Sequence, residues 1–136
     1  MLDLIPHDMA AVLETERRIA DGPQILLRTE NVFHAGLYAR TIMVPRGVTI
    51  AGALIVIPTL LIVSGDVDVI IGRETTRITG YAVLEGQAGR KQAFHAHADT
   101  HLTMLFATDA QDVTDAEEQF TDEAGRLGSR REGDDR

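Results

Sequence analysis

The middle of the chain carries short apolar runs separated by glycine-containing turns. The longest run, VTIAGALIVIPTLLIV, occupies residues 48–63, and another follows at 67–71. Turns that recur roughly every 8–12 residues predict short antiparallel strands of a sandwich or barrel, here of the jelly-roll kind. The candidate strands are 24–28, 37–44, 48–51, 53–57, 59–63, 66–71, 74–78, 81–85, 91–95 and 101–107, with turns at 45–47, 64–66, 72–73 and 85–86. The pattern therefore predicts an all-β, single-domain jelly-roll barrel.

Helical spacing is confined to the two ends of the chain. Residues 7–19 predict a short helix after Pro6. Thr114 and Glu117 form a capping-box pattern that opens a second helix ending near Phe120. The predicted organisation is an N-terminal helical segment, the barrel, a short C-terminal helix and a charged, flexible tail, over residues 1–22, 23–108, 109–120 and 121–136.

Composition narrows the classes of function. The chain has 136 residues, 44% of them hydrophobic, which suits one domain with a packed core. Its net charge of -8 argues against partners that present phosphate, both nucleic acids and anionic membrane surfaces. The absence of cysteine excludes disulfides and thiolate chemistry. The apolar stretch at 48–63 is too short for a membrane helix, and no signal peptide is recognisable, so we expect a cytoplasmic protein.

Residues 30–108 resemble a single-domain cupin in the order of their predicted elements. In that family, the first motif supplies a His-x-His pair and a Glu to a metal, and the second motif supplies another His. When the last Gly of the first motif is aligned with Gly65, the two histidine positions fall on Gly52 and Leu54, or one residue earlier. The glutamate position falls on Pro58. The second-motif histidine falls on Gln92. The resemblance therefore implies that the metal ligands have been lost, and we expect no cofactor and no tightly bound transition metal.

A narrower resemblance rests on three short motifs. These are the stretch 36–40, Gly-Leu-Tyr-Ala-Arg, with His34 just before it, the turn 89–91, Gly-Arg-Lys, and the pair 99–100, Asp-Thr. Together with a short acidic C-terminal helix, they resemble small cupin-like proteins of tailed bacteriophages and prophages. This implies a phage-related structural or accessory protein, other virion proteins as partners, and virion association as an alternative location.

Histidines supply one candidate site. His95, His97 and His101 have the same parity along the chain, with Asp99 between them, so an extended strand would project them to one face. Imidazole and carboxylate ligands suit Zn²⁺ or a similar ion. A turn at Asp99 would break this alignment, since Asp in a turn tends to bond local backbone N–H groups. We predict that these histidines share no role, and keep a relocated metal site as the alternative.

A second candidate site combines His34, Tyr38 and Arg40. Arg40 is able to hold the carboxylate of a ligand with two N–H bonds. The competing interpretation, which we favour, is a structural ion pair with one of the many acidic residues of the chain.

The run Leu54–Ile57 lacks polar alternation, which suggests that both faces of a strand are covered. One cover is the core, and association of identical copies is the simplest second cover. We therefore predict a homo-oligomer with Leu60, Leu61 and Ile62 at or beside the interface. The predicted function is that of a non-enzymatic structural or accessory protein that acts through self-association. The alternatives are a cupin enzyme or sensor that uses the relocated histidine site, and a metal-free binder of a small ligand in an apolar pocket.

Overall fold

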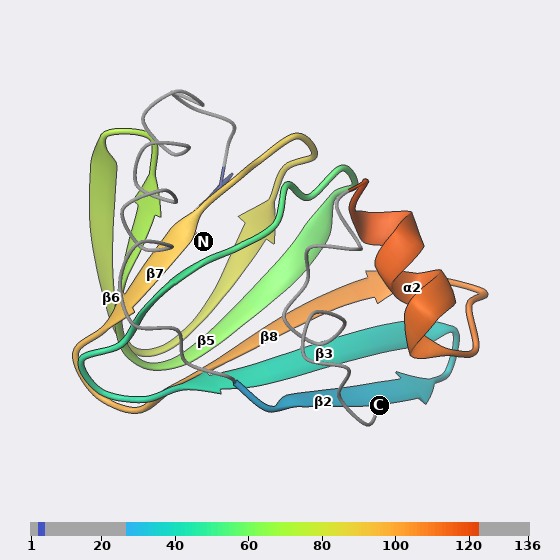
Figure 1. The fold of residues 1–136 in the computed structure, drawn as a ribbon, viewed down its shortest axis with the longest axis horizontal. Helices are drawn as coiled ribbons and strands as arrows, with labels where there is room; N and C mark the ends of the chain where they lie inside the picture. The colour runs from blue at the N-terminus through green and yellow to red at the C-terminus, as the bar shows by residue number, and fades with distance from the viewer. Residues whose placement is uncertain (1–2, 5–26, 123–136) are drawn as a thin grey trace.

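The computed structural model describes residues 3–4 and 27–122, which form a curled antiparallel sheet with one short helix at its end (Figure 1). In chain order the elements are β1 (Asp3–Leu4), β2 (Thr29–His34), β3 (Leu37–Val44), β4 (Thr49–Ala51), β5 (Thr59–Ile71), β6 (Glu74–Gly86), β7 (Ala93–Ala96), β8 (Thr100–Ala107) and α2 (Val113–Phe120). The strand order is β1-β6-β5-β8-β3-β2, and β7 pairs with both β5 and β4. The predicted all-β jelly-roll is confirmed.

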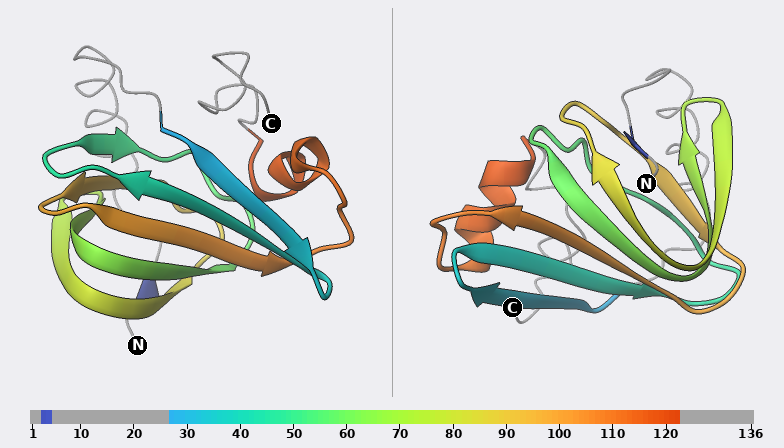
Figure 2. Two further views of the ribbon diagram at one scale, coloured as in Figure 1. Left: turned by 90° about the horizontal axis from the view of Figure 1, so that it is seen from below. Right: turned by 180° about the vertical axis from the view of Figure 1, so that it is seen from behind.

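Strand β5 belongs to both halves of the curled sheet. Its residues 60–64 pair with β8, and its residues 67–70 pair with β7. Between them Gly65 lies opposite Gly80 of β6, and a β-carbon on Gly65 would come within 2.4 Å of Thr100 Oγ1. Because Gly65 has no side chain, β8 can approach β5 where the sheet curls (Figure 2). The predicted turn at 64–66 is therefore wrong, since these residues form the middle of a continuous strand.

Other strand boundaries also depart from the sequence pattern. Residues 53–57 are not a strand, and Ile55 makes only an isolated bridge with Arg90. The predicted strands 74–78 and 81–85 merge into β6, which runs through the predicted turn at 85–86. By contrast, 37–44 is confirmed as β3, and the turns at 45–47 and 72–73 are present.

The N-terminal prediction needs a similar correction. Strand β2 begins at Thr29, whereas the expected strand was 24–28, of which only residues 27–28 are described, and neither is in a strand. The predicted helix at 7–19 lies outside the described residues, as does nearly all of the tail. No helix in the described ranges is long and apolar enough to cross a membrane.

The core lies inside the curl, where alternate residues of each strand point inward. The main cluster of buried residues is Val44, Leu61, Val63, Val67, Val69, Ile78, Leu84, Phe94, Ala96 and Leu102. A second cluster lies at the α2 end and consists of Tyr38, Ile55, Phe106, Ala116 and Phe120. Helix α2 thus buries its apolar face against strands β3 and β8, beside the main core (Figure 1).

The start of α2 differs from the predicted capping box. The N-cap is Asp112, whose side chain accepts a hydrogen bond of 2.8 Å from the backbone N–H of Asp115. Aspartate satisfies an otherwise unpaired N–H there as well as threonine would. Thr114 and Glu117 consequently lie within the helix, and Glu117 is fully buried. The acidic residue that suggested a cap is instead part of the interior.

Candidate functional site

The positions that the cupin resemblance assigns to metal ligands hold no imidazole or carboxylate. Gly52 and Gln92 do lie side by side, since the Gly52 N–H donates to the Gln92 carbonyl at 2.8 Å. A β-carbon on Gly52 would come within 3.2 Å of that oxygen, so the Gln92 carbonyl would have to move by a few tenths of an ångström to accept it. With Leu54 and Pro58 completing the set, the residues present do not fit a transition metal.

A buried arginine lies at this place instead. The Arg90 side chain is 1% exposed, and it donates to Gln92 Oε1 at 3.2 Å, to the Gln87 carbonyl at 2.9 Å and to Thr59 Oγ1 at 2.7 Å. Its guanidinium lies against Gly86, where a β-carbon would be 2.4 Å from Cζ. Burial lowers the pKa of Arg90 to about 10, which leaves it cationic at neutral pH. The guanidinium of Arg90 therefore links the chain at Gln87 and Gln92 to Thr59 at the start of β5.

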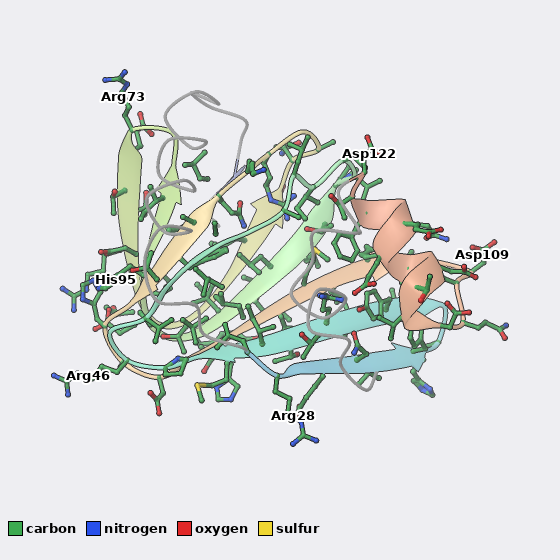
Figure 3. All side chains as sticks on the ribbon, viewed as in Figure 1. Arg28, Arg46, Arg73, His95, Asp109 and Asp122 are labelled. Atoms are coloured by element: carbon green, nitrogen blue, oxygen red, sulfur yellow. The ribbon has the colours of Figure 1, made fainter. Side chains whose placement is uncertain are left out.

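The histidine candidates are only partly brought together. The rings of His95 and His97 lie 5.1 Å apart at an interplanar angle of 84°. His95 Nδ1 is 2.6 Å from Thr49 Oγ1. His97 Nε2 is 2.9 Å from Asp68 Oδ2, an ion-pair distance without hydrogen-bond geometry. Figure 3 shows His95 at the end of the molecule away from Asp109, which lies close to α2.

His101 does not complete a metal site. It lies on β8, opposite Met43 of β3 and Ser64 of β5. Across residues 3–4 and 27–122, no three His, Cys, Asp or Glu side chains are arranged to hold a metal ion. The chain bends at His97 and Ala98 between β7 and β8, so the extended alignment is interrupted. Asp99 Oδ1 accepts from the Arg46 N–H at 2.9 Å, which is not the local backbone bond expected of a turn. That the three histidines share no role stays a prediction.

The group His34, Tyr38 and Arg40 is split between two faces. Tyr38 and Arg40 share the inward face of β3, while His34 is exposed on β2. Arg40 Nη1 lies 2.9 Å from Glu117 Oε2 and 3.2 Å from the Tyr38 hydroxyl. The Tyr38 hydroxyl donates in turn to Asn31 Oδ1. The arginine thus engages a carboxylate of the chain itself, in line with the structural ion pair that we favoured.

This ion pair is well shielded from water. The Arg40 and Glu117 side chains are 13% and 0% exposed, and the Arg40 guanidinium lies over the Phe120 ring at 5.4 Å. The pair connects β3 to α2 at the end of the sheet. Sequence reasoning missed Glu117 because the capping-box pattern assigned it to the helix surface. It missed Arg90 because nothing marks an arginine in a Gly-Arg-Lys turn as buried.

One surface of the sheet, which we call the outer face, is mainly apolar. It consists of the outward side chains of β2, β3 and β8, of residues 60–64 of β5 and of residues 81–85 of β6. One row across it is Val32, Ala39, Leu105, Leu60 and Glu85. The next row is Glu30, Thr41, Thr103, Ile62 and Val83. The exposed large apolar side chains of the described residues are all on this face: Val32 57%, Leu37 41%, Met43 38%, Leu60 38% and Tyr81 69%. An apolar surface of this kind is typical of an interaction site.

The predicted interface residues divide between the two sides of β5. Leu60 and Ile62 belong to the outer face, whereas Leu61 points inward and is 4% exposed in the core. Leu61 is therefore corrected to a core residue, because successive side chains of a strand point to opposite faces. The two outward residues remain available to a partner.

Charge is absent from the centre of the outer face. The outward residues of β3, of β8 and of residues 60–64 of β5 include no Asp, Glu, Lys or Arg, while Glu30 and Glu85 lie on the flanking strands. The central threonines bond to each other, with Thr41 Oγ1 and Thr103 Oγ1 2.7 Å apart. An apolar centre with charged flanks is the usual anatomy of a protein–protein interface.

Comparison with solved structures identifies the fold as that of the cupins. A cupin superfamily protein from Desulfitobacterium hafniense superposes with a TM-score of 0.52 at 11% identity, covering 65% of this chain and 83% of that chain. The cupin domain of an XRE family transcriptional regulator from Enterobacter cloacae gives 0.51 at 12% identity, covering 63% of this chain and 100% of that chain. At such identities the likeness establishes the fold alone.

An enzyme shares the same fold. A variant of salicylate 1,2-dioxygenase from Pseudoaminobacter salicylatoxidans superposes with a TM-score of 0.51 at 15% identity, covering 71% of this chain and 32% of that chain. No family model and no curated protein matches the sequence. Because the structural neighbours include a regulator as well as an enzyme, the fold assigns no activity, and function has to be argued from the surfaces and sites of this chain.

Proposed function

We propose that this cupin-fold protein is non-catalytic and acts through association of identical copies by way of the outer face. The observation that carries the proposal is the uncharged, largely apolar surface of β3, β8 and β5, which includes the exposed side chains of Leu37, Met43 and Leu60. Removing such surface from water contributes about 25 cal/mol for each Å² buried, which offsets the entropy that two copies lose on association. A second copy carries the same apolar surface, and its three central strands add no Asp, Glu, Lys or Arg to desolvate.

The dimensions of the outer face suit a dimer. Five strands at a spacing of about 4.8 Å span about 19 Å, and an eight-residue strand such as β3 is about 27 Å long. These two lengths outline the backbone of the outer face. Its outward side chains add contact area, which brings each copy closer to the roughly 800 Å² that a partner contributes to a stable interface. The flanking residues Glu30 and Glu85 then form a rim where water stays in contact with charge.

The experiment is sedimentation equilibrium at pH 8 of the parent and of two Asp variants. Ile62→Asp puts a charge at the centre of the outer face and should weaken association at least 100-fold, because an unpaired charge in a buried apolar contact costs several kcal/mol. Thr75→Asp is the matched control, since Thr75 is an exposed residue of β6 that pairs with Ile70, away from the outer face. It should keep the parental association constant.

Two results would contradict the proposal. A parent protein that is monomeric at high micromolar concentration removes it outright. A parent that associates, with Ile62→Asp and Leu60→Asp both retaining its assembly, places the interface elsewhere. Leu61→Asp has a different expected outcome, because that side chain lies in the core. It should prevent folding, which circular dichroism detects, and not simply yield a folded monomer.

The finer part of the proposal is a structural or accessory role in a tailed phage, with other virion proteins as further partners. Its support is the sequence resemblance at 36–40, 89–91 and 99–100. Sequencing the DNA that flanks the coding region tests it. Neighbouring genes for tail or capsid proteins are the expected result, and a position within an operon of metabolic enzymes would contradict the phage role while leaving self-association in place.

A further inference from the structure

We propose that association through the outer face is controlled by pH, with His101 as the residue that senses it. This inference rests on the proposed function. His101 is exposed on β8, where it lies opposite Met43 of β3 and Ser64 of β5. Tyr81 of β6 continues the same row, since it pairs with Ser64. The imidazole thus lies between an apolar side chain and a small hydroxyl on one of the three central strands.

The other charged groups around His101 are at the borders of this surface or are already bonded. One of them is the cation Arg28, which is exposed and directly precedes β2, where Thr29 pairs with Ile42 of β3. Along β8 the neighbouring Asp99 accepts from the Arg46 N–H. Beyond the curl of β5, Asp66 is held by Arg77 through bonds of 2.9 and 2.7 Å. On the side of β2 the nearest carboxylate belongs to Glu30, and on the side of β6 to Glu85.

Two consequences follow from this layout. Facing β3 and β5, His101 meets Met43 and Ser64, neither of which carries a charge that could compensate an imidazolium. The remaining histidine of the outer face, His34, is exposed at the end of the flanking strand β2, opposite Leu37, and does not lie on one of the three central strands. His101 is therefore the ionisable side chain on the central strands from which a docked copy would remove water.

The direction of the effect follows from the cost of burying charge. A neutral imidazole is readily buried in an interface, whereas an imidazolium without a carboxylate partner resists desolvation. Because each of the two copies must bury the imidazole in its neutral form, the association constant should fall about 15-fold between pH 8 and pH 6. General electrostatics gives the opposite sign. The net charge of -8 becomes less negative on acidification, which reduces repulsion and strengthens association.

The test measures association constants by sedimentation equilibrium at pH 8, 7 and 6 and constant ionic strength, a range that lies above the titration of ordinary carboxylates. The parent should weaken about 15-fold on acidification. His101→Gln, which is polar but neutral throughout, should lose most of the pH dependence, whatever its association constant at pH 8. His95→Gln on β7, away from the outer face, is the control and should keep the parental profile. His34→Gln tests the other histidine of the outer face, and the association of that variant should keep its dependence on pH.

The outcomes separate this inference from the proposed function. A parent that is monomeric at pH 8 contradicts the proposed function and this inference with it. A parent that associates, but whose association is constant or strengthens toward pH 6, contradicts the pH control alone. A His101→Gln protein that retains the parental loss, or a His34→Gln protein that abolishes it, assigns the titration to another group and overturns the role of His101.

Discussion

Replacing Glu117 by Gln tests how far the buried ion pair holds α2 on the sheet. The substitution keeps the shape of the side chain and removes its charge, so Arg40 is left as a cation only 13% exposed and facing an amide. Arg40 still lies near the Tyr38 hydroxyl and the Phe120 ring, neither of which carries a full negative charge. The expected result is a large loss of stability without a change of fold.

The magnitude follows from the geometry of the pair. Opposite charges 2.9 Å apart attract by about 6 kcal/mol at an effective dielectric constant of about 20. Part of this attraction offsets the desolvation of both groups, and removing one partner of a buried pair typically costs about 3–5 kcal/mol. Because Arg40 retains some contact with water, we expect about 3 kcal/mol for Glu117→Gln. That is a substantial part of the roughly 5–15 kcal/mol that stabilises a domain.

Urea unfolding followed by circular dichroism measures the loss, at two protein concentrations so that association is separated from folding. Glu118→Gln is the matched control on an exposed position of the same helix, and it should change stability by less than about 0.5 kcal/mol. The double variant Arg40→Met with Glu117→Leu should be more stable than Glu117→Gln, since it removes both charges of the pair together. A loss below about 1 kcal/mol for Glu117→Gln would refute the reasoning.

Two further predictions concern the curl of the sheet and acid stability. Gly65→Ala should lower the free energy of unfolding by about 2–4 kcal/mol, because its β-carbon would clash with Thr100. Gly80→Ala meets no atom within 4 Å and should cost only about 1 kcal/mol for its positive φ. Thermal unfolding of the two variants distinguishes these losses, and equal losses would contradict the clash. The hydrogen bond from Arg77 lowers the pKa of Asp66, so this contribution to stability is present above the ordinary carboxyl pKa and is lost as pH falls through the folded-state pKa. The difference in stability between the parent and Asp66→Asn should therefore be largest near pH 7, diminish in acid and be smaller in 1 M salt, and a difference unchanged down to pH 2 would contradict the pairing.

The fold class was predictable because the alternation and the turn residues are clear along most of the barrel. Strand β3 was located from its pattern alone, with the turn at 45–47 after it. The centre of β5 was not, since Ser64, Gly65 and Asp66 are ordinary turn residues. Only the close approach of Thr100, far away in sequence, shows why a glycine is needed in the middle of this strand.

The candidate sites were harder to predict for a related reason. Leu60, Leu61 and Ile62 are all apolar, so the sequence does not say which of them points inward, and a shift of one residue exchanges the two faces. Glu117 fits a capping box as well as an ion pair, and only the packing of α2 against β3 decides between them. Propensity and spacing describe neighbours along the chain, whereas these assignments depend on contacts between residues far apart in it.

The sharing of β5 between the two halves of the sheet also has a consequence for how the protein folds. Because β5 pairs with β6 over its whole length and with β8 and β7 over separate parts of its other edge, both halves of the sheet lose hydrogen bonds if β5 leaves its place. We therefore expect the amide protons of β5 to exchange with solvent only through global unfolding, and to be among the slowest in the chain. During synthesis, β5 and β3 must wait for β8, which ends at Ala107, so the sheet closes only after most of the chain has left the ribosome.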